Sequence, residues 1–331
     1  MKNRFFVSTN QIMKVSSVVS KMQISLTQLG AFQIVGTIFS YCRVGSNGGA
    51  IFFDNSQSNL TILFTGFDHC GLNGIGVGGA FYLSSIFQFL CRVVCFQNCS
   101  ADHCASYVML GYQNDKFWRS NMNFTSECSP FYARSASTFY ARTNSLFYNN
   151  NISRSKTDTL SSGINFGNQE NGEIVRFLNL CESQGPGFMR FHSYLTTQTI
   201  LGLSYCNFIN NVVNSSWSWF RPATNHKILI KNSVFYNCPS TRMILSSETS
   251  MLTIDFADCS FSNIYNSVHF SNCITNNCFF SIEAPTNDLE LIVYGECWGD
   301  GTQIVTNNFN ILNPKYFYIP SNIFIFFVVN E

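Results

Sequence analysis

Charged residues are scarce in this chain of 331 residues. Lys and Arg together number 19 and Asp and Glu number 18, which gives a formal net charge of +1 and a charged fraction of 11%. Soluble domains usually carry about 25% charged residues. Because no basic excess or basic stripe is present, we predict no nucleic-acid partner. The aromatic fraction of 16% argues against a disordered chain, since such chains are poor in aromatic residues.

Long apolar runs are also missing. Lys14 and Lys21 interrupt the N-terminal segment, so no stretch there has the length of a signal-peptide core. No window reaches the roughly 20 apolar residues of a transmembrane helix, and we predict no membrane span. Residues 313–331 are apolar but are broken at Pro320. We interpret them as a buried C-terminal strand, with a truncated remnant of a membrane anchor as the alternative.

What the chain does contain is an internal repeat. The motif Phe-x-x-Cys starts at Phe39, Phe67, Phe96 and Phe235. Looser copies place a Phe anchor at positions 124, 147, 177, 208 and 261. Each unit holds two short runs of β-branched and aromatic residues, separated by turns rich in Asn, Ser and Gly. No unit has an amphipathic pattern long enough for a helix.

A unit of strand, turn, strand and turn with a period of roughly 28 residues is typical of one coil of a parallel β-solenoid. We therefore predict an all-β fold with about ten coils over residues 32–312, after a poorly assigned segment at 1–31. Coils stacked about 4.8 Å apart place equivalent residues above one another as ladders. The predicted structural ladders consist of Phe39, Phe67, Phe96 and Phe235 and of Cys42, Cys70, Cys99 and Cys238. A β-sandwich has no reason to repeat this motif, and a leucine-rich solenoid is disfavoured because its Leu-x-x-Leu-x-Leu-x-x-Asn template is absent.

Two further short motifs carry a family resemblance. Gly48-Gly49-Ala50-Ile51 and Gly78-Gly79-Ala80-Phe81, with Phe147-x-x-Asn150 and Phe208-x-x-Asn211, resemble the GGA(I/L/V) and FxxN repeats of the polymorphic outer membrane protein family. Similar surface proteins occur in large sets in trichomonad protists. The resemblance covers roughly residues 32–300. It implies a single right-handed parallel β-helix of the pectin-lyase type, a surface or secreted location, and adhesion to a host or cell-surface glycan or protein. Only two units keep Gly-Gly-Ala.

Enzymatic chemistry has little support in the sequence. Glycoside hydrolysis requires two carboxylates that flank one bond, and lyase chemistry requires a positioned base. The acidic residues are scattered, and the closest pair is Asp255 and Asp258. We predict no enzyme and no catalytic residue. Two alternatives stay open: a carbohydrate-active β-helix lyase or hydrolase, and a purely structural solenoid or divergent gene fragment.

The 14 cysteines allow several interpretations. Cys91, Cys95, Cys99 and Cys104, with His103, have spacings within reach of zinc, but no second pair of ligands follows, so we predict no metal and no cofactor. Cys91, Cys95 and Cys99 share parity on extended chain, which favours buried thiols; disulfides and zinc are the alternatives. Asp68-His69-Cys70 is no catalytic triad by itself, because neighbouring residues on a strand point to opposite faces.

Two surface features complete the candidate residues. Sequons begin at Asn59, Asn98, Asn123, Asn151 and Asn214, and these are glycosylation acceptors if the chain is secreted. Trp217 and Trp219 lie two residues apart on an expected strand and therefore share one face. We interpret them as a candidate aromatic binding patch, with a core strand or coil boundary as the alternative.

Overall fold

The computed structural model describes residues 13–281, 298–299 and 303–304, apart from internal gaps. These gaps are 17–18, 21–22, 56, 85, 102–103, 111–116, 122–123, 127, 129–136, 142–144, 158–160, 168, 170–171, 193–198, 214–217, 222–225, 240–241, 245–253 and 263–272. The apolar segment 313–331 therefore lies outside the described residues.

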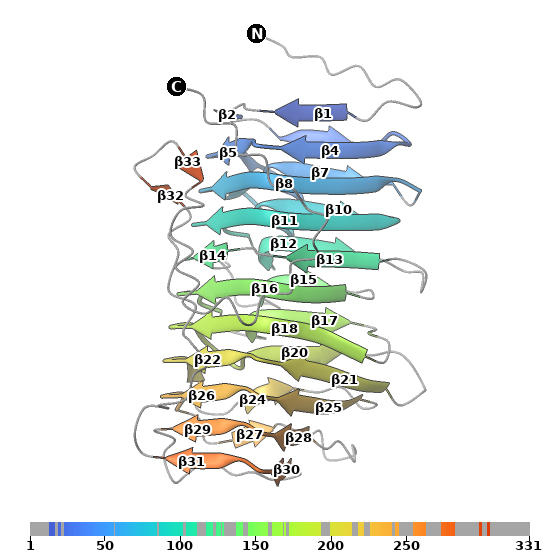
Figure 1. Ribbon diagram of the computed structural model, residues 1–331. Helices are drawn as coiled ribbons and strands as arrows, with labels where there is room; N and C mark the ends of the chain where they lie inside the picture. The colour runs from blue at the N-terminus through green and yellow to red at the C-terminus, as the bar shows by residue number, and fades with distance from the viewer. Residues whose placement is uncertain are drawn as a thin grey trace.

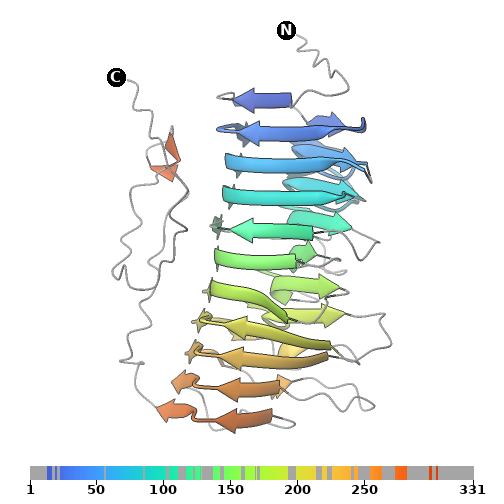
Figure 2. The same ribbon diagram turned by 45° about the vertical axis from the view of Figure 1, so that its right-hand side comes forward.

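The predicted all-β solenoid is confirmed: strands stack in parallel along one axis (Figures 1 and 2). The largest sheet has 18 strands and forms two adjoining faces. Its longer face contains β1 (Met13–Ser16), β4 (Ala31–Val35), β8 (Asn59–Asp68), β11 (Gln88–Gln97), β13 (Phe117–Asn121), β16 (Ser145–Ser153), β18 (Gly172–Cys181), β21 (Thr199–Ser204), β25 (His226–Lys231), β28 (Ile254–Ala257) and β30 (Cys273–Asn276). Strands β8, β11, β16 and β18 bend and continue into the shorter face, which adds β2 (Val19–Ser20), β5 (Ile38–Ser40), β14 (Phe124–Ser126), β22 (Asn207–Ile209), β26 (Val234–Tyr236), β29 (Ser260–Ser262) and β31 (Phe279–Ser281).

A second sheet of nine strands closes the other side of the solenoid. It consists of β3 (Ile24–Leu26), β7 (Ile51–Asp54), β10 (Phe81–Ser84), β12 (Cys104–Leu110), β15 (Ser137–Ala141), β17 (Ser161–Gly167), β20 (Met189–His192), β24 (Ser218–Arg221) and β27 (Arg242–Ile244). Small pairs are β6 (Arg43–Val44) with β9 (Gly71–Leu72), β19 (Gln184–Gly185) with β23 (Val212–Val213), and the antiparallel β32 (Trp298–Gly299) with β33 (Gln303–Ile304).

The coil count differs from the ten that the repeat predicts. Eleven strands follow one another on the longer face, from β1 to β30, whereas the second sheet has nine. Strands β1, β2 and β3 lie before residue 32, so the stack begins N-terminal to the predicted range. The repeat motif could not reveal this start, because no Phe-x-x-Cys occurs there.

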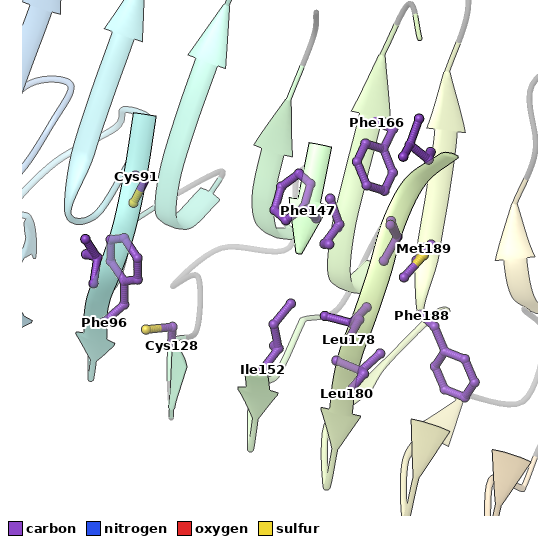
Figure 3. Close-up of a cluster of buried hydrophobic side chains, with 14 of the residues drawn as sticks. Cys91, Phe96, Cys128, Phe147, Ile152, Phe166, Leu178, Leu180, Phe188 and Met189 are labelled. Carbon is purple, nitrogen blue, oxygen red and sulfur yellow. The ribbon is translucent and has the colours of Figure 1, made fainter. Parts of the chain in front are cut away.

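One interior column runs through the shorter face. The backbone register aligns Phe39, Phe67, Phe96, Thr125, Ile152, Leu180, Phe208, Phe235, Phe261 and Phe280. The described side chains of this column are buried except that of Phe280, in the last coil. Neighbouring rings stack, with centroids 5.1 Å apart for Phe39 and Phe67 and 4.7 Å apart for Phe208 and Phe235. Figure 3 shows Phe96, Ile152 and Leu180 in this core, with the coil of Cys128 between Phe96 and Ile152. Stacked aromatic and aliphatic side chains thus fill a single continuous interior.

The structure corrects three of the looser Phe anchors. The column holds Thr125, Ile152 and Leu180 where Phe124, Phe147 and Phe177 were predicted. Ile152 and Leu180 fill the interior with an aliphatic side chain in place of a ring, so the nearest Phe is not always the equivalent residue. With this correction, the spacing between successive anchors is nearly constant from Phe39 to Phe261, whereas the spacing of Phe alone is uneven.

Where the structure describes both sides of an anchor, the coil bends at two residues with positive φ, one on either side of it. The bends before the anchor are Gly36, Phe64, Val93, Asn149, Phe177, Tyr205, Asn232, Asp258 and Asn277, and those after it are Tyr41, His69, Asn98, Arg154, Glu182, Asn210 and Asn237. The residue after a bend is usually small, and its side chain bonds the carbonyl two residues earlier. Ser233 donates to the Lys231 carbonyl over 2.8 Å, and Cys238 to the Tyr236 carbonyl over 3.3 Å. In the motif Phe-x-x-Cys, the Phe is therefore the interior anchor, the second residue points outward and the third is the bend. The Cys is the buried residue after the bend, which we call the cap.

The Gly-Gly-Ala motif marks another corner, just before a strand of the second sheet. Gly48 has a φ of 73°, in the left-handed region that favours glycine. A Cβ on Gly49 would collide with the backbone of Gly79 and Gly71 in the next coil. Ala50 is fully buried, and strand β7 begins directly after it. Neighbouring coils approach so closely at this corner that only very small side chains fit, which explains the Gly-Gly-Ala motif.

The bend at Phe64 gives a first testable prediction. Its φ is 49°, and its side chain is 39% exposed, so a bulky residue occupies a left-handed bend with little burial in return. Asparagine occupies several equivalent bends and tolerates this conformation better. We expect Phe64→Asn to raise the free energy of unfolding by about 0.5–1 kcal/mol in urea titrations. Ile75→Asn, an exposed residue without positive φ, is the control and leaves stability unchanged; equal effects would contradict the strain at residue 64.

Candidate functional site

The described residues include a cluster on the outside of the solenoid that we call the Arg176 corner and define as Arg176, Phe177 and Tyr205. The Phe177 and Tyr205 rings stack with centroids 5.1 Å apart and planes at 25°. The Arg176 guanidinium carbon lies 4.9 Å from the Phe177 centroid and 5.4 Å from that of Tyr205. A cation held over two rings is a favourable arrangement and places charge and aromatic area together.

The fold explains why these residues meet. Phe177 is the bend within β18, and Tyr205 is the bend after β21 in the next coil. Arg176 is in register with Ser204, so the two bends lie one above the other. The Ser204 hydroxyl donates to the Glu173 carboxylate across the same two coils. The Nε atom of Arg176 is buried and has no hydrogen-bond partner within the chain.

A smaller aromatic pair lies at the bends that follow the anchors. The Tyr41 and His69 rings stack with centroids 4.7 Å apart, and Tyr41 is 57% exposed. His69 Nδ1 lies 2.6 Å from Asp68 Oδ1. Cys70, the next residue, is fully buried and donates its thiol to the Phe39 carbonyl. Asp68 and His69 thus lie outside and Cys70 inside, so these three residues do not converge on a reacting atom.

The candidate tryptophan patch is wrong for Trp219. This residue is fully buried, and its ring stacks between Phe188 at 5.5 Å and Phe235 at 5.1 Å. Phe220, its neighbour, is also fully buried. Alternation fails because residue 219 fills the corner before the interior strand, the place that Ala50 and Ala80 occupy in their coils. Trp217 lies outside the described residues.

The described carboxylates are dispersed over the solenoid, and several contact a partner of their own. Lys227 Nζ is 2.6 Å from Asp255 Oδ2, and Arg154 Nε is 3.5 Å from Glu182 Oε2. Asp258 accepts a hydrogen bond from Asn277. In the part of the chain that the structure describes, no three His, Cys, Asp or Glu side chains are grouped as a metal site. The corners therefore offer aromatic and hydrogen-bonding surface rather than paired carboxylates.

Comparison with protein-family models, curated proteins and solved structures finds no match for this chain. The described residues include no helix that is long and apolar enough to cross a membrane. The site must therefore be assessed on its own geometry.

The sequons differ in accessibility. Asn151 is only 6% exposed, and its Oδ1 is buried without a hydrogen-bond partner, so the folded chain has no room for a glycan there. Asn59 and Asn98 are half-buried, and Asn98 is itself a bend with a φ of 50°. Asn123 and Asn214 lie outside the described residues. If the chain is secreted, we expect the folded fraction to carry glycan at Asn98 and none at Asn151, which glycopeptide mass spectrometry can check.

The cysteine cluster does not share one face. Cys91 and Cys99 are interior, but the bend at Val93 shifts the parity, so Cys95 lies on the opposite side of the strand from Phe96. Cys95 is in a disulfide. Burial raises the pKa of Cys206 and of Cys238 to about 12, which keeps both thiols protonated at neutral pH.

Sequence reasoning missed the Arg176 corner. The only signal for it is that Phe177 and Tyr205 are separated in the sequence by one coil period. Phe177 was instead assigned to the interior, and that assignment concealed the outward aromatic pair.

Proposed function

We propose that this chain is a non-enzymatic adhesion scaffold, displayed at a cell surface or secreted, that binds a glycan or protein ligand through the Arg176 corner. The observation that carries the proposal is the pair of stacked rings with a cation over them, held by two successive coils. Tyr, Trp and Arg are the residues that most often dominate binding surfaces. The resemblance to polymorphic outer membrane proteins supports adhesion, a right-handed pectin-lyase-type winding and a surface location.

The arrangement of charges favours binding over carbohydrate cleavage. Hydrolysis of a glycosidic bond needs two carboxylates about 5–10 Å apart that act on one sugar. Asp255, Asp258 and Glu182 each form a contact with Lys227, Asn277 or Arg154 instead. The proposal therefore assigns no catalytic residue.

The test uses the full chain, with binding measured on a glycan array and on intact host cells. Tyr205→Asn is the informative variant, because Asn149 and Asn232 occupy equivalent bends and the fold should tolerate it. We expect at least a tenfold loss of binding, since removing an aromatic hot-spot residue typically costs about 1.4 kcal/mol or more. Tyr41→Asn, at a bend that follows an anchor rather than precedes it, is the matched control and should bind like the unaltered chain.

Three results would oppose this proposal in different ways. Equal binding by the Tyr205 and Tyr41 variants would remove the Arg176 corner as the site. Absence of any binding by the full chain would favour a purely structural solenoid. Shortening of a polysaccharide during the assay would favour the carbohydrate-active alternative. Location is tested separately, by labelling intact cells of the native organism with a membrane-impermeant biotin reagent; an unlabelled protein that is present in the lysate would contradict surface display.

A further inference from the structure

Four thiols stand one above another inside the N-terminal half of the solenoid. Cys42, Cys70 and Cys99 each follow a bend in successive coils, Cys128 is the next residue of the same column, and all four are fully buried. The same column continues with Ser155, Ser183, Asn211 and Cys238. We call these eight positions the Cys42 column. Only its first four positions bring thiols next to one another.

Backbone hydrogen bonds fix the vertical alignment of these thiols. The Gly71 amide donates to the Cys42 carbonyl over 2.9 Å, and the Ser100 amide donates to the Cys70 carbonyl over 3.0 Å. Adjacent thiols contact one another from Cys42 to Cys70, from Cys70 to Cys99 and from Cys99 to Cys128. Figure 3 shows the Cys128 sulfur pointing toward the coil that carries Phe96.

Coil spacing suits a disulfide between vertical neighbours. Parallel strands lie about 4.8 Å apart, and disulfides join Cα atoms that are about 4.4–6.8 Å apart. If only vertical neighbours can bond, four thiols in a row can all be paired in only one way: the first with the second and the third with the fourth. A bond between the two middle thiols would leave both outer thiols single.

We propose that these four thiols form a cross-linking site, in which Cys42 bonds Cys70 and Cys99 bonds Cys128 when the chain folds with a small-molecule disulfide such as oxidised glutathione. In each pair one thiolate attacks the small disulfide and expels a first glutathione thiolate. The second protein thiolate then attacks the mixed disulfide and expels the other. Two protein thiols lose two electrons and two protons, and one oxidised glutathione becomes two reduced molecules.

Cross-linking belongs to folding rather than to the finished solenoid. Burial and the neighbouring thiols raise the pKa of Cys99, and the thiolate is the reactive form. Once the coils close, no oxidant reaches a fully buried sulfur. A chain that folds under reducing conditions therefore keeps four thiols, and a chain that folds under oxidising conditions gains two bonds between coils. This inference does not depend on the adhesion proposal.

The experiment refolds the full chain in reduced and oxidised glutathione, blocks remaining thiols with N-ethylmaleimide, and maps disulfide-linked peptides by mass spectrometry. We expect the linked pairs 42–70 and 99–128 and a rise in the thermal midpoint on the order of 5 °C per bond. Cys70→Ser should abolish the first link and keep the second, and Cys99→Ser should do the reverse. Cys238→Ser, in the same column beside Asn211, should keep both links.

Cys95 provides an internal standard, because it forms a disulfide at a different place in the fold. If Cys95 is recovered as a disulfide while Cys42, Cys70, Cys99 and Cys128 are all alkylated, the proposal is wrong. Links between distant members of the column, such as 42–128, would also overturn it. Far-UV circular dichroism establishes that each sample is folded, and the mapping of the unaltered chain alone is decisive if a serine variant does not fold.

Discussion

Truncating Phe235 to alanine is expected to unfold the C-terminal coils first. Phe235 is fully buried, and its ring stacks on Phe208 at 4.7 Å and on Phe261 at 4.9 Å. Trp219 stacks against it from the second sheet at 5.1 Å. Replacing a core Phe by Ala typically costs about 3–5 kcal/mol, because the surrounding side chains collapse only partly into the cavity. A loss of that size is a large part of the stability of a typical domain.

The column itself provides matched controls for this prediction. Phe280 stacks on Phe261 but is 55% exposed, so Phe280→Ala should cost about 1 kcal/mol or less. Phe235→Leu should cost about 1.5 kcal/mol, since Leu180 and Ile152 occupy equivalent positions. Urea unfolding measures the free energies of unfolding. Hydrogen exchange locates the coils that unfold first, and we expect these between β22 and β31 because solenoid coils depend on their neighbours. Similar losses for the Phe235 and Phe280 alanine variants would contradict the assignment of residue 235 to the core.

Sequence periodicity was sufficient for the fold class but not for every register. Strict copies of the motif located Phe39, Phe67, Phe96 and Phe235, because both the ring and the cysteine cap are conspicuous residues. Between residues 100 and 208 the equivalent positions in the register are Thr125, Ile152 and Leu180. Ile152 and Leu180 fill the interior with aliphatic side chains, which a search for Phe does not detect. Hydrophobic packing constrains volume and polarity more strongly than identity. A search for Phe alone therefore loses the register there.

The candidate surface was harder to predict for a related reason. Strict alternation assigns neighbouring residues to opposite faces, yet Trp219 and Phe220 are both interior because a corner intervenes. Alternation likewise failed for Cys95, where the bend at Val93 resets the parity. Bends with positive φ carry no fixed residue type here: Phe177, Tyr205, Glu182 and Asn210 all occupy them. Without the bends, the outward pair at the Arg176 corner cannot be distinguished from core aromatics.

Alkaline pH is expected to destabilise the reduced solenoid strongly. Desolvation by burial raises the pKa of Cys206, Cys238 and Cys259 to about 12. An unfolded thiol titrates near 8.5, so above that pH the unfolded chain releases protons that the folded chain still holds. The stabilisation is therefore fully present below about pH 8.5 and is lost as pH rises toward 12. At pH 10.5 the stabilisation from each buried thiol has fallen by nearly 3 kcal/mol, and that from the three together by about 8 kcal/mol.

Serine substitution separates these thiols from the other groups that titrate at high pH. Ser155 and Ser183 occupy the same column as Cys238. Ser233 lies between Cys206 and Cys259 in the column of residues that follow the bends before the anchors. The fold therefore already accepts serine at equivalent positions. A variant with all three cysteines changed to serine should stay folded to a higher pH than the unaltered chain. Circular dichroism is followed from pH 8 to 11 in both proteins, with a phosphine reductant and constant ionic strength. If both unfold at the same pH, tyrosine and lysine titration rather than the buried thiols controls the alkaline limit. The difference between the two midpoints thus measures directly how strongly the interior holds its cysteine protons.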